Sequence, residues 1–247
     1  MNEPGGTVRL QEDAYSRIIA IGDLHGHRAP LKELFHRIDL RSSDFIVFIG
    51  DYVDRGPDSK DLVQELIDLR FSHPNAAFLK GNHEDMLLGA LGYSAIVSDL
   101  QTWMYNGGAA TLLSYGVEMG ELGRIQSIWD NGERSAALRK LLPPAHIDFF
   151  LGLELYVESE GFFFCHAGLD PDQSIEQGKN NTYHLLWMRD HLYAEAPVWE
   201  KTVVCGHTPI EYPLITPKLI SIDTGLHYFG KLTAVEVRSR EIFQVSM

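Results

Sequence analysis

The chain is poor in cysteine and has no long apolar run. Only two cysteines occur in its 247 residues, so a disulfide framework has no support and a reducing cytoplasm is the simplest compartment to expect. Apolar runs such as Phe45 to Ile49 have the length of a strand and fall far short of the roughly 20 residues of a membrane span. We therefore expect a soluble protein that makes no use of a membrane.

Basic residues are also scarce. Lysine and arginine total 21 against 34 aspartates and glutamates, which gives a formal net charge of -13. Affinity for a nucleic-acid backbone comes mainly from clustered basic residues, and the sequence contains no such run. We expect no nucleic-acid partner, and the sequence does not predict the oligomeric state.

The N-terminal segment, residues 1–16, is polar and contains Pro4, Gly5 and Gly6. It has neither the basic start nor the apolar core of a signal peptide, and we predict a short loose leader. A hydrophobic content of 45% is enough for one sizeable core. Residues 17–247 are therefore predicted to form a single domain.

Apolar and amphipathic segments alternate over the first eighty residues. We predict strands at residues 17–21, 44–49 and 76–79, with helices at 29–38 and 58–69. This alternation predicts a largely parallel sheet flanked by helices.

The pattern changes after Glu84. Helical segments are expected at residues 85–91, 94–105, 107–115 and 133–142, and they predict a helical insertion. The insertion either walls the functional site or covers one sheet face, and sequence favours neither. The last hundred residues contain short β runs at 153–157, 162–165, 202–205, 219–222 and 232–237, which predict a second, mostly antiparallel sheet. The predicted fold class is α/β.

Residues of metal-ligand type follow nearly every strongly apolar run. They lie in Gly22-Asp23-Leu24-His25, Gly50-Asp51-Tyr52-Val53-Asp54-Arg55-Gly56, Gly81-Asn82-His83-Glu84, Cys165-His166-Ala167-Gly168 and Gly206-His207-Thr208. Polar residues just beyond strand ends can converge in one crevice without being buried unpaired. Their oxygen and imidazole donors suit catalytic Mn, Fe or Zn ions. The recurrence predicts a binuclear metal hydrolase.

Each cysteine directly precedes a candidate ligand or its glycine. Strand side chains alternate between faces, so Cys165 is expected to point away from His166. We predict that Cys165 and Cys205 are buried core residues, with a thiol ligand as the alternative.

The ordered motifs GDLHG, GDYVDRGP, GNHE, HAG and GHT resemble those of the metal-dependent phosphoprotein phosphatase family within the calcineurin-like phosphoesterases. The resemblance runs from about Ile18 to the C-terminus. Later segments, Trp103 to Gly108, Leu186 to Arg189 and Ser221 to Gly225, look like the bacterial and bacteriophage branch typified by lambda phosphatase. The resemblance implies a metallophosphoesterase-type two-sheet β sandwich flanked by helices, with residues 17–247 as the catalytic domain.

The resemblance also implies two divalent ions, with manganese expected first and iron or zinc as alternatives. Asp23 and His25 would bind the first ion and Asp51 would bridge both. Asn82, His166 and His207 would complete the second site. Two carboxylates and a shared hydroxide leave such a cluster positive, which attracts a phosphate despite the acidic protein. The alternative for any single histidine is a hydrogen-bonded core or turn residue.

His83 would protonate the leaving group, and Asp54 would fix its tautomer and keep it protonated. A turn-forming role is the alternative for Asp54. Arg55 and Arg189, together with Asn82, would bind the substrate's phosphoryl oxygens. The alternative for Arg189 is a surface salt bridge. Glu84 and Asp223 are interpreted as supporting carboxylates and not as ligands.

The implied reaction is one-step attack of a metal-bridging hydroxide on phosphorus, without a phosphoenzyme. The intact Asp54 favours a serine/threonine protein phosphatase, because the symmetrical dinucleoside tetraphosphatase branch usually lacks that aspartate. A diadenosine tetraphosphate hydrolase or another small-phosphoester hydrolase is the alternative. A catalytically silent interaction scaffold is a third reading, which the complete set of chemistry-bearing residues disfavours.

Overall fold

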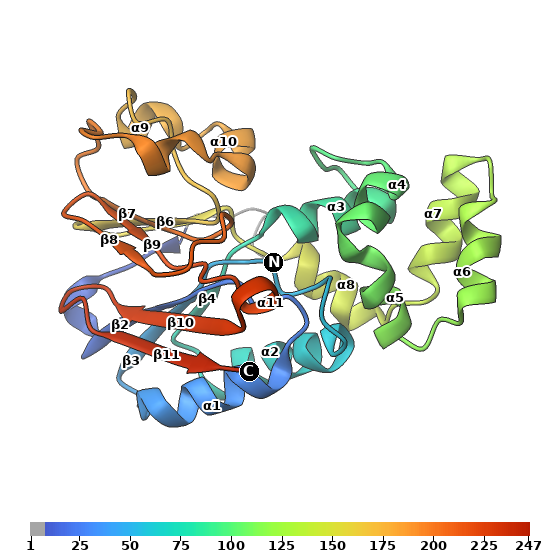
Figure 1. Cartoon of the computed structure of the whole chain (residues 1–247), viewed down its shortest axis with the longest axis horizontal. Coiled ribbons are helices and arrows are strands. Elements are labelled where there is room, and N and C mark those ends of the chain that lie inside the picture. The colour runs from blue at the N-terminus through green and yellow to red at the C-terminus, as the bar shows by residue number, and fades with distance from the viewer. Residues whose placement is uncertain (1–7) are drawn as a thin grey trace.

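Strands with apolar side chains on both faces form two stacked sheets, and helices cover the outer faces (Figure 1). The computed structural model describes residues 8–247. This arrangement confirms the predicted α/β class of two sheets flanked by helices. Within residues 8–247, every helix is too short or too polar to cross a membrane.

The first sheet has five strands in the order β11-β10-β2-β3-β4. Their bounds are β2 (Arg17–Ile21), β3 (Asp44–Phe48), β4 (Ala76–Phe78), β10 (Lys231–Glu236) and β11 (Ile242–Ser246). Strands β2, β3 and β4 are parallel, as the alternation of strands and helices predicts. Strands β10 and β11 join antiparallel to the β2 edge.

The second sheet has six strands in the order β1-β5-β6-β7-β9-β8. Their bounds are β1 (Val8–Arg9), β5 (Tyr156–Glu158), β6 (Phe162–Cys165), β7 (Thr202–Cys205), β8 (Leu214–Ile215) and β9 (Leu219–Ser221). The expectation of a mostly antiparallel sheet is wrong, because β6, β7 and β9 run parallel. The long connection between β6 and β7 carries helices, and it permits the crossover that parallel strands require.

Alternate residues of a strand pack into different hydrophobic cores. Ile18 and Ala20 face the second sheet, where they pack with residues such as Val204. Ile19 and Ile21 face the helices instead. A third core lies between the second sheet and the helices above it. The middle of the sandwich is therefore apolar, so polar side chains gather beyond the strand ends.

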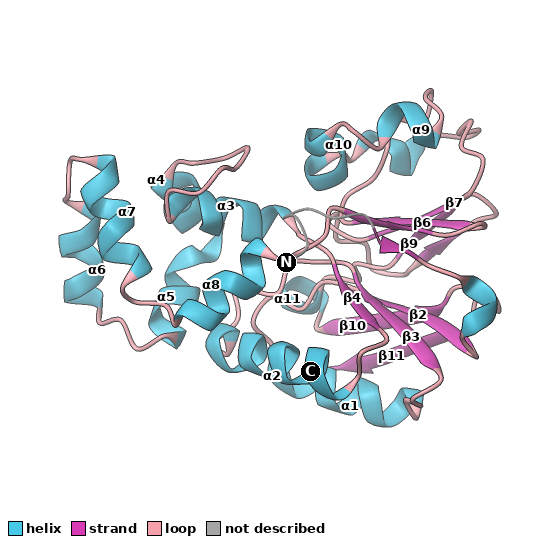
Figure 2. Cartoon of the chain, turned by 180° about the vertical axis from the view of Figure 1, so that it is seen from behind, coloured by secondary structure: helices cyan, strands magenta, loops and turns pink. Residues whose placement is uncertain are grey.

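Helices lie on three sides of the sandwich (Figures 1 and 2). The first sheet is covered by α1 (Arg28–Ile38) and α2 (Ser59–Ser72), and the second by α9 (Ile175–Gly178) and α10 (Thr182–Trp187). Two short 3-10 turns, η1 (Glu12–Ala14) and η3 (Asp190–Tyr193), and helix α11 (Leu226–Phe229) complete this part.

The predicted helical insertion extends to one side of the sheets (Figure 2). It comprises α3 (Asn82–Ala90), α4 (Leu100–Trp103), the π-helical turn η2 (Met104–Gly108), α5 (Ala109–Ser114), α6 (Met119–Gln126), α7 (Asn131–Arg139) and α8 (Pro144–Leu151). The helix predicted from residue 94 begins only at Leu100, because the Asp99 side chain caps it by accepting the N–H of Thr102 at 2.8 Å. Helices α6 and α8 were not predicted.

The predicted loose leader needs a partial correction. Residues 1–7 lie outside the described residues, but Val8 and Arg9 pair with β5 and Leu10 is buried. An apolar residue at position 10 can enter the core between the sheets, which a polar average over sixteen residues hides. The boundary between a leader and a single catalytic domain stays a prediction.

Candidate active site

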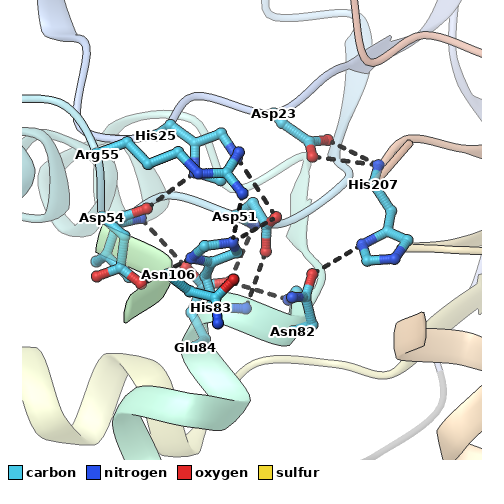
Figure 3. Close-up of polar contacts among 12 residues, drawn as sticks. Asp23, His25, Asp51, Asp54, Arg55, Asn82, His83, Glu84, Asn106 and His207 are labelled. Carbon is cyan, nitrogen blue, oxygen red and sulfur yellow. Dashed lines mark hydrogen bonds and ion pairs between the residues drawn. The ribbon is translucent and has the colours of Figure 1, made fainter. Parts of the chain in front are cut away.

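The polar motifs meet at the carboxyl ends of the parallel strands. Asp23 and His25 follow β2, and Asp51 follows β3. His166 and His207 follow β6 and β7 of the other sheet. Parallel strands end at the same sheet edge, so these loops converge without a polar group entering the apolar sandwich. The close-up in Figure 3 shows Asp51 between the side chains contributed by the different loops.

The backbone of these loops is unusual. His25, Asp51, Asp54, Arg55 and His207 all have φ between 42° and 72°, in the left-handed region that side chains other than glycine avoid. Such conformations persist where surrounding structure fixes them, and they cluster at functional sites. Backbone strain is therefore concentrated at five residues that the sequence predicts to bind metal, to bind substrate or to take part in catalysis.

Two glycines make room for two carboxylates. A Cβ at Gly81 would lie 2.1 Å from Oδ1 of Asp51, and one at Gly206 would lie 2.2 Å from Oδ1 of Asp23. Both positions must lack a side chain, because neither carboxylate could otherwise keep its place. This requirement explains the glycines that precede Asn82 and His207 in their motifs.

Asp51 is shared by two buried groups of donors. His25, Asp51 and His83 form one group, and Asp51, His166 and His207 form the other. Oδ2 of Asp51 lies 3.6 Å from Nε2 of His25 and 3.9 Å from Nε2 of His83, while Oδ1 lies 3.4 Å from Nε2 of His166. One carboxylate thus faces each group with a different oxygen, which is the geometry that a bridging ligand requires.

Asn82 completes the second group. Its Oδ1 lies 2.9 Å from Nε2 of His166 and 2.8 Å from Nδ1 of His207. The other ring nitrogen of His207, Nε2, is buried and has no hydrogen-bond partner among residues 8–247. Oδ1 of Asn82, Nε2 of His166 and Nδ1 of His207 are metal-ligand atoms that converge with Oδ1 of Asp51 in one buried place, so this group fits a cation. Helix α3 begins at Asn82 and holds the amide in place.

Asp23 lies beside the two donor groups, and its predicted ligation of the first ion stays a prediction. Its carboxylate accepts the backbone N–H of His207 at 3.1 Å, and it belongs to neither of the two donor groups. Burial, followed by the charges of Asp223 and Asp51, raises the pKa of Asp23 well above its usual value. Burial likewise raises the pKa of Asp223 to about 6. Three buried carboxylates close together favour a bound cation.

The imidazoles are suited to metal binding. Burial lowers the pKa of His25, His166 and His207, so these rings are neutral near pH 7, as ligands must be. Burial opposes ionisation of Asp51, but the surrounding histidines outweigh it and lower the pKa of this carboxyl far below its usual range. The negative charge of Asp51 is therefore available to bind cations.

His83 is held differently from the other histidines. Its Nδ1 lies 2.7 Å from Oδ2 of Asp54, a fully buried carboxylate. Burial alone would lower the pKa of His83, but the charge of Asp51, the hydrogen bond to Asp54 and the charge of Asp54 raise it. His83 is thus fixed in orientation and favoured in its protonated form.

The helical insertion supplies the support for Asp54. Trp103 donates its Nε1–H to both oxygens of Asp54 at 3.0 Å, and the hydroxyl of Thr111 donates to Oδ1 at 2.6 Å. The Oγ1 of Thr111 also accepts the backbone N–H of Asp54 at 2.8 Å. The question that sequence left open is answered here, because α4, η2 and α5 wall the site. The sequence does not predict Trp103 and Thr111 as site residues, although Trp103 lies in the segment 103–108 that carries part of the family resemblance.

Glu84 organises the loop that carries Asp51. Its two oxygens accept the backbone N–H groups of Gly81, Asp51, Tyr52 and Val53 at 2.7–3.3 Å. Burial and the charge of Asp51 raise the pKa of Glu84 to about 8, whereas four N–H donors favour its anion. Its predicted role as a supporting carboxylate agrees with this position.

The two arginines occupy unequal positions. Arg55 lies in the centre, with NH1 2.8 Å from Nε2 of His25 and NH2 3.2 Å from Nε2 of His83. Arg189 is at the surface, where NH1 lies 3.4 Å from the hydroxyl of Thr208, and no ion pair forms with its acidic neighbours within residues 8–247. Its charge lowers the pKa of His207, after burial and His166, so it faces the same site.

The two cysteines are buried and free, as predicted. Cys165 and Cys205 belong to the core between the second sheet and α9 and α10, on the face opposite the sandwich interior. Burial raises the pKa of both thiols, and neither belongs to the donor groups around Asp51. A thiol ligand is therefore not part of this arrangement.

Comparisons with known proteins agree with the geometry. The family model of the calcineurin-like phosphoesterases matches residues 16–239. A bis(5'-nucleosyl)-tetraphosphatase PrpE [asymmetrical] of Bacillus cereus is 24% identical over 91% of this chain and 92% of its own length. Among solved structures, a candidate diadenosine tetraphosphatase covers 98% of both chains at 22% identity with a TM-score of 0.64. A serine/threonine phosphatase of Saccharomyces cerevisiae, similar to human PP5, covers 98% of this chain and 83% of its own at 15% identity with a TM-score of 0.59.

Proposed function

Because this chain belongs to the calcineurin-like phosphoesterase family, we propose that it is a binuclear-metal phosphohydrolase that cleaves a P–O bond. Members of the family use two divalent ions, and the described residues contain His and Asp groups that could hold them. The observation that carries the proposal is the buried Asp51 carboxylate, whose two oxygens face separate groups of imidazoles.

The proposed ligands follow from these contacts. Asp51 bridges the two ions, His25 binds one of them, and Asn82, His166 and His207 bind the other. Asp23 would bind the first ion together with His25, because its carboxylate has lone pairs to spare while it accepts the backbone N–H of His207. When bound, the two ions supply positive charge at the phosphoryl oxygens and lower the pKa of a coordinated water. We propose manganese as the working metal, on the basis of the mixed oxygen and nitrogen donors.

The residues around the ions have separate proposed tasks. His83 donates a proton from Nε2 to the leaving oxygen, since Asp54 holds Nδ1 and leaves the opposite edge facing the site. Arg55 binds the phosphoryl oxygens with its planar donors, assisted by the Asn82 amide, and Arg189 adds charge at the rim. No serine or threonine nucleophile is required.

A serine/threonine phosphoprotein is one candidate substrate, and the pair of Asp54 and His83 supports it. A serine or threonine alkoxide is a poor leaving group, so a positioned acid accelerates its departure by about 10²–10⁴-fold. A phosphate leaving from an anhydride is a far better leaving group and has less need of an acid. Asp54 is buried and makes one hydrogen bond through its backbone N–H and three through its carboxylate. An enzyme that cleaved only anhydrides would have little use for so well-held a partner of the acid His83.

A dinucleoside tetraphosphate is the second candidate. Curated relatives with this activity in their names match over nine-tenths of the chain, and they are named as asymmetrical enzymes. The presence of Asp54 disfavours the symmetrical branch only, so it does not weigh against these relatives. Exposed tyrosines beside Arg55 also favour a substrate with an aromatic part.

An activity panel tests the proposal. The chelator-treated protein is assayed before and after manganese is restored, with p-nitrophenyl phosphate, phosphoserine and phosphothreonine peptides, and diadenosine tetraphosphate as substrates. We expect hydrolysis only with metal. Full activity in protein shown by elemental analysis to be metal-free contradicts the proposal, and the ratio of kcat/KM between peptides and dinucleotide ranks the two substrate classes.

A further inference from the structure

A depression opens directly beside Arg55. Its volume is about 400 Å³, which lies within the range of roughly 300–1,000 Å³ that small-molecule sites occupy. The residues that line it are Arg55, Tyr105, Asn106, Gly107, Ala110, His227 and Tyr228. They come from the loop after β3, from the insertion at η2 and α5, and from α11, so three separate parts of the chain build one hollow.

Two tyrosines of this hollow expose their rings to solvent. Tyr105 is 92% exposed and Tyr228 is 57% exposed. Tyrosine has a large apolar ring and a polar tip, which suits it to contacts that form only when a ligand is present. Tyr228 lies on helix α11, between Gly225 and Gly230. Its ring centre lies 5.4 Å from that of His227, so a neighbour that also lines the hollow positions the ring.

Arg55 is common to this hollow and the phosphoryl site. Its guanidinium carbon lies 5.1 Å from the ring centre of Tyr228. The same guanidinium contacts Nε2 of His25 and Nε2 of His83. Gly107 makes the approach possible, because its carbonyl accepts the N–H of Arg55 at 3.3 Å and a Cβ there would lie 2.8 Å from that nitrogen. A ligand whose phosphate contacts Arg55 therefore has its next group in the hollow beside Tyr228.

The residues that line the hollow indicate what kind of ligand fits it. No carboxylate is among the seven lining residues, although the whole chain has a net charge of -13. The lining offers aromatic faces, one permanent cation and the Asn106 amide. A planar, electron-rich ring joined to a phosphate fits these groups, whereas the short side chain of a phosphoserine has no ring to place against the tyrosines.

We propose that this hollow is a nucleobase subsite, in which Tyr105 and Tyr228 contact the base of a nucleotide whose phosphate lies at Arg55. The inference rests on the proposed phosphoryl site and selects nucleotides among its candidate substrates. Base stacking tolerates different bases, so the subsite should favour ligands that carry a base over ligands that lack one, whichever base it is.

The test compares two ligands that differ only in the base. Binding of AMP and of ribose 5-phosphate is measured by calorimetry on manganese-loaded protein in the His83→Asn background, which slows turnover during the titration. We expect AMP to bind on the order of ten-fold more tightly. Tyr105→Ala should lower this ratio severalfold without changing the affinity for ribose 5-phosphate. Tyr228→Ala should also lower the ratio, although it should weaken ribose 5-phosphate too because the ring contacts Arg55, and Tyr228→Phe should preserve the ratio.

Tyr193→Ala is the matched control, since Tyr193 is 83% exposed and lies outside the hollow. Equal affinities for AMP and ribose 5-phosphate overturn the inference, as does a ratio that neither alanine variant changes. A preference for phosphotyrosine without one for AMP also overturns it, because it identifies an aryl site for protein substrates. The readout is binding alone, so a failure of the proposed hydrolysis remains distinguishable from a failure of the subsite.

Discussion

The two halves of the site are built differently. Loops of the five-stranded sheet hold their side chains through dense networks, in which Asp54 has three side-chain partners and Glu84 has four backbone partners. The half from the six-stranded sheet is sparser. His166 contacts the carbonyl of Ile49 through Nδ1, and His207 leaves Nε2 buried without a partner among residues 8–247.

This difference separates two tasks. The first half is satisfied by protein groups, which suits residues that must hold a proton and a phosphate in fixed positions. In the second half, His166 and His207 face Asn82, and His166 also faces Asp51, which suits residues whose proposed task is to bind an ion. Asp51 comes from the first half but belongs to both donor groups, so it should be the position where the loss of one side chain affects the whole site.

The largest effect is expected from Asp51→Asn. The substitution removes the negative charge that two cations share, so their mutual repulsion grows and both weaken together. We expect kcat/KM on p-nitrophenyl phosphate to fall by at least about 10³-fold. Steady-state kinetics with manganese over a wide concentration range measure the loss. An activity within tenfold of the wild type would remove Asp51 from the bridging position.

His83→Asn should have a large effect that depends on the substrate. The amide cannot donate a proton to a departing alkoxide, so esters with poor leaving groups should slow by about 10²–10⁴-fold. p-Nitrophenyl phosphate needs little protonation and should slow much less, while metal content stays the same. The comparison of kcat for the two substrates is the measurement, and an equal slowing of both excludes the acid role.

Trp103→Phe tests whether the insertion acts on the acid. The variant keeps the ring and loses the N–H that Asp54 accepts, so His83 should remain in place but be less well oriented. We expect roughly a tenfold loss for substrates with poor leaving groups and an altered pH profile. Trp129→Phe, at a residue that is 97% exposed, is the control. An identical loss for p-nitrophenyl phosphate would indicate a general disturbance of the site.

The smallest effect should come from a buried ion pair far from the chemistry. Arg17 contacts the fully buried Asp44 through two hydrogen bonds of 2.6 and 3.1 Å. Burial alone would raise the pKa of Asp44, but the hydrogen bond from Arg17, the Arg41 N–H and the charge of Arg17 lower it below its usual value of 3.8. The ionised group therefore stabilises the fold at pH above 3.8, and this contribution is lost as pH falls through the lowered pKa.

Asp44→Asn should thus lower the free energy of unfolding by about 1–3 kcal/mol near pH 7, and the difference from wild type should shrink below pH 3.8. Urea unfolding across this range gives the result. Glu33→Gln, which breaks the exposed pair with Arg37, should cost only about 0–1 kcal/mol. A difference for Asp44→Asn that grows on acidification would show that the sign is wrong.

The same contrast explains what sequence could and could not predict. The position of ligand-type residues after apolar runs predicts that Asp51, His166 and His207 lie together, and they do, because the strand ends bring them to one place. The contact between Trp103 and Asp54 was not predictable from composition or spacing, since it depends on how α4 packs forty-nine residues away. The parallel pairing of β6, β7 and β9 was missed because short β runs do not reveal whether a crossover joins them.

Metal stoichiometry after gel filtration tests the central claim most directly, because it separates a bridging ligand from a terminal one. Manganese-loaded wild type should retain about two ions per chain, Asp51→Asn should retain close to none, and His207→Ala, which loses one neutral donor from one site, should retain about one. Two ions retained by Asp51→Asn would contradict the shared carboxylate on which the account depends.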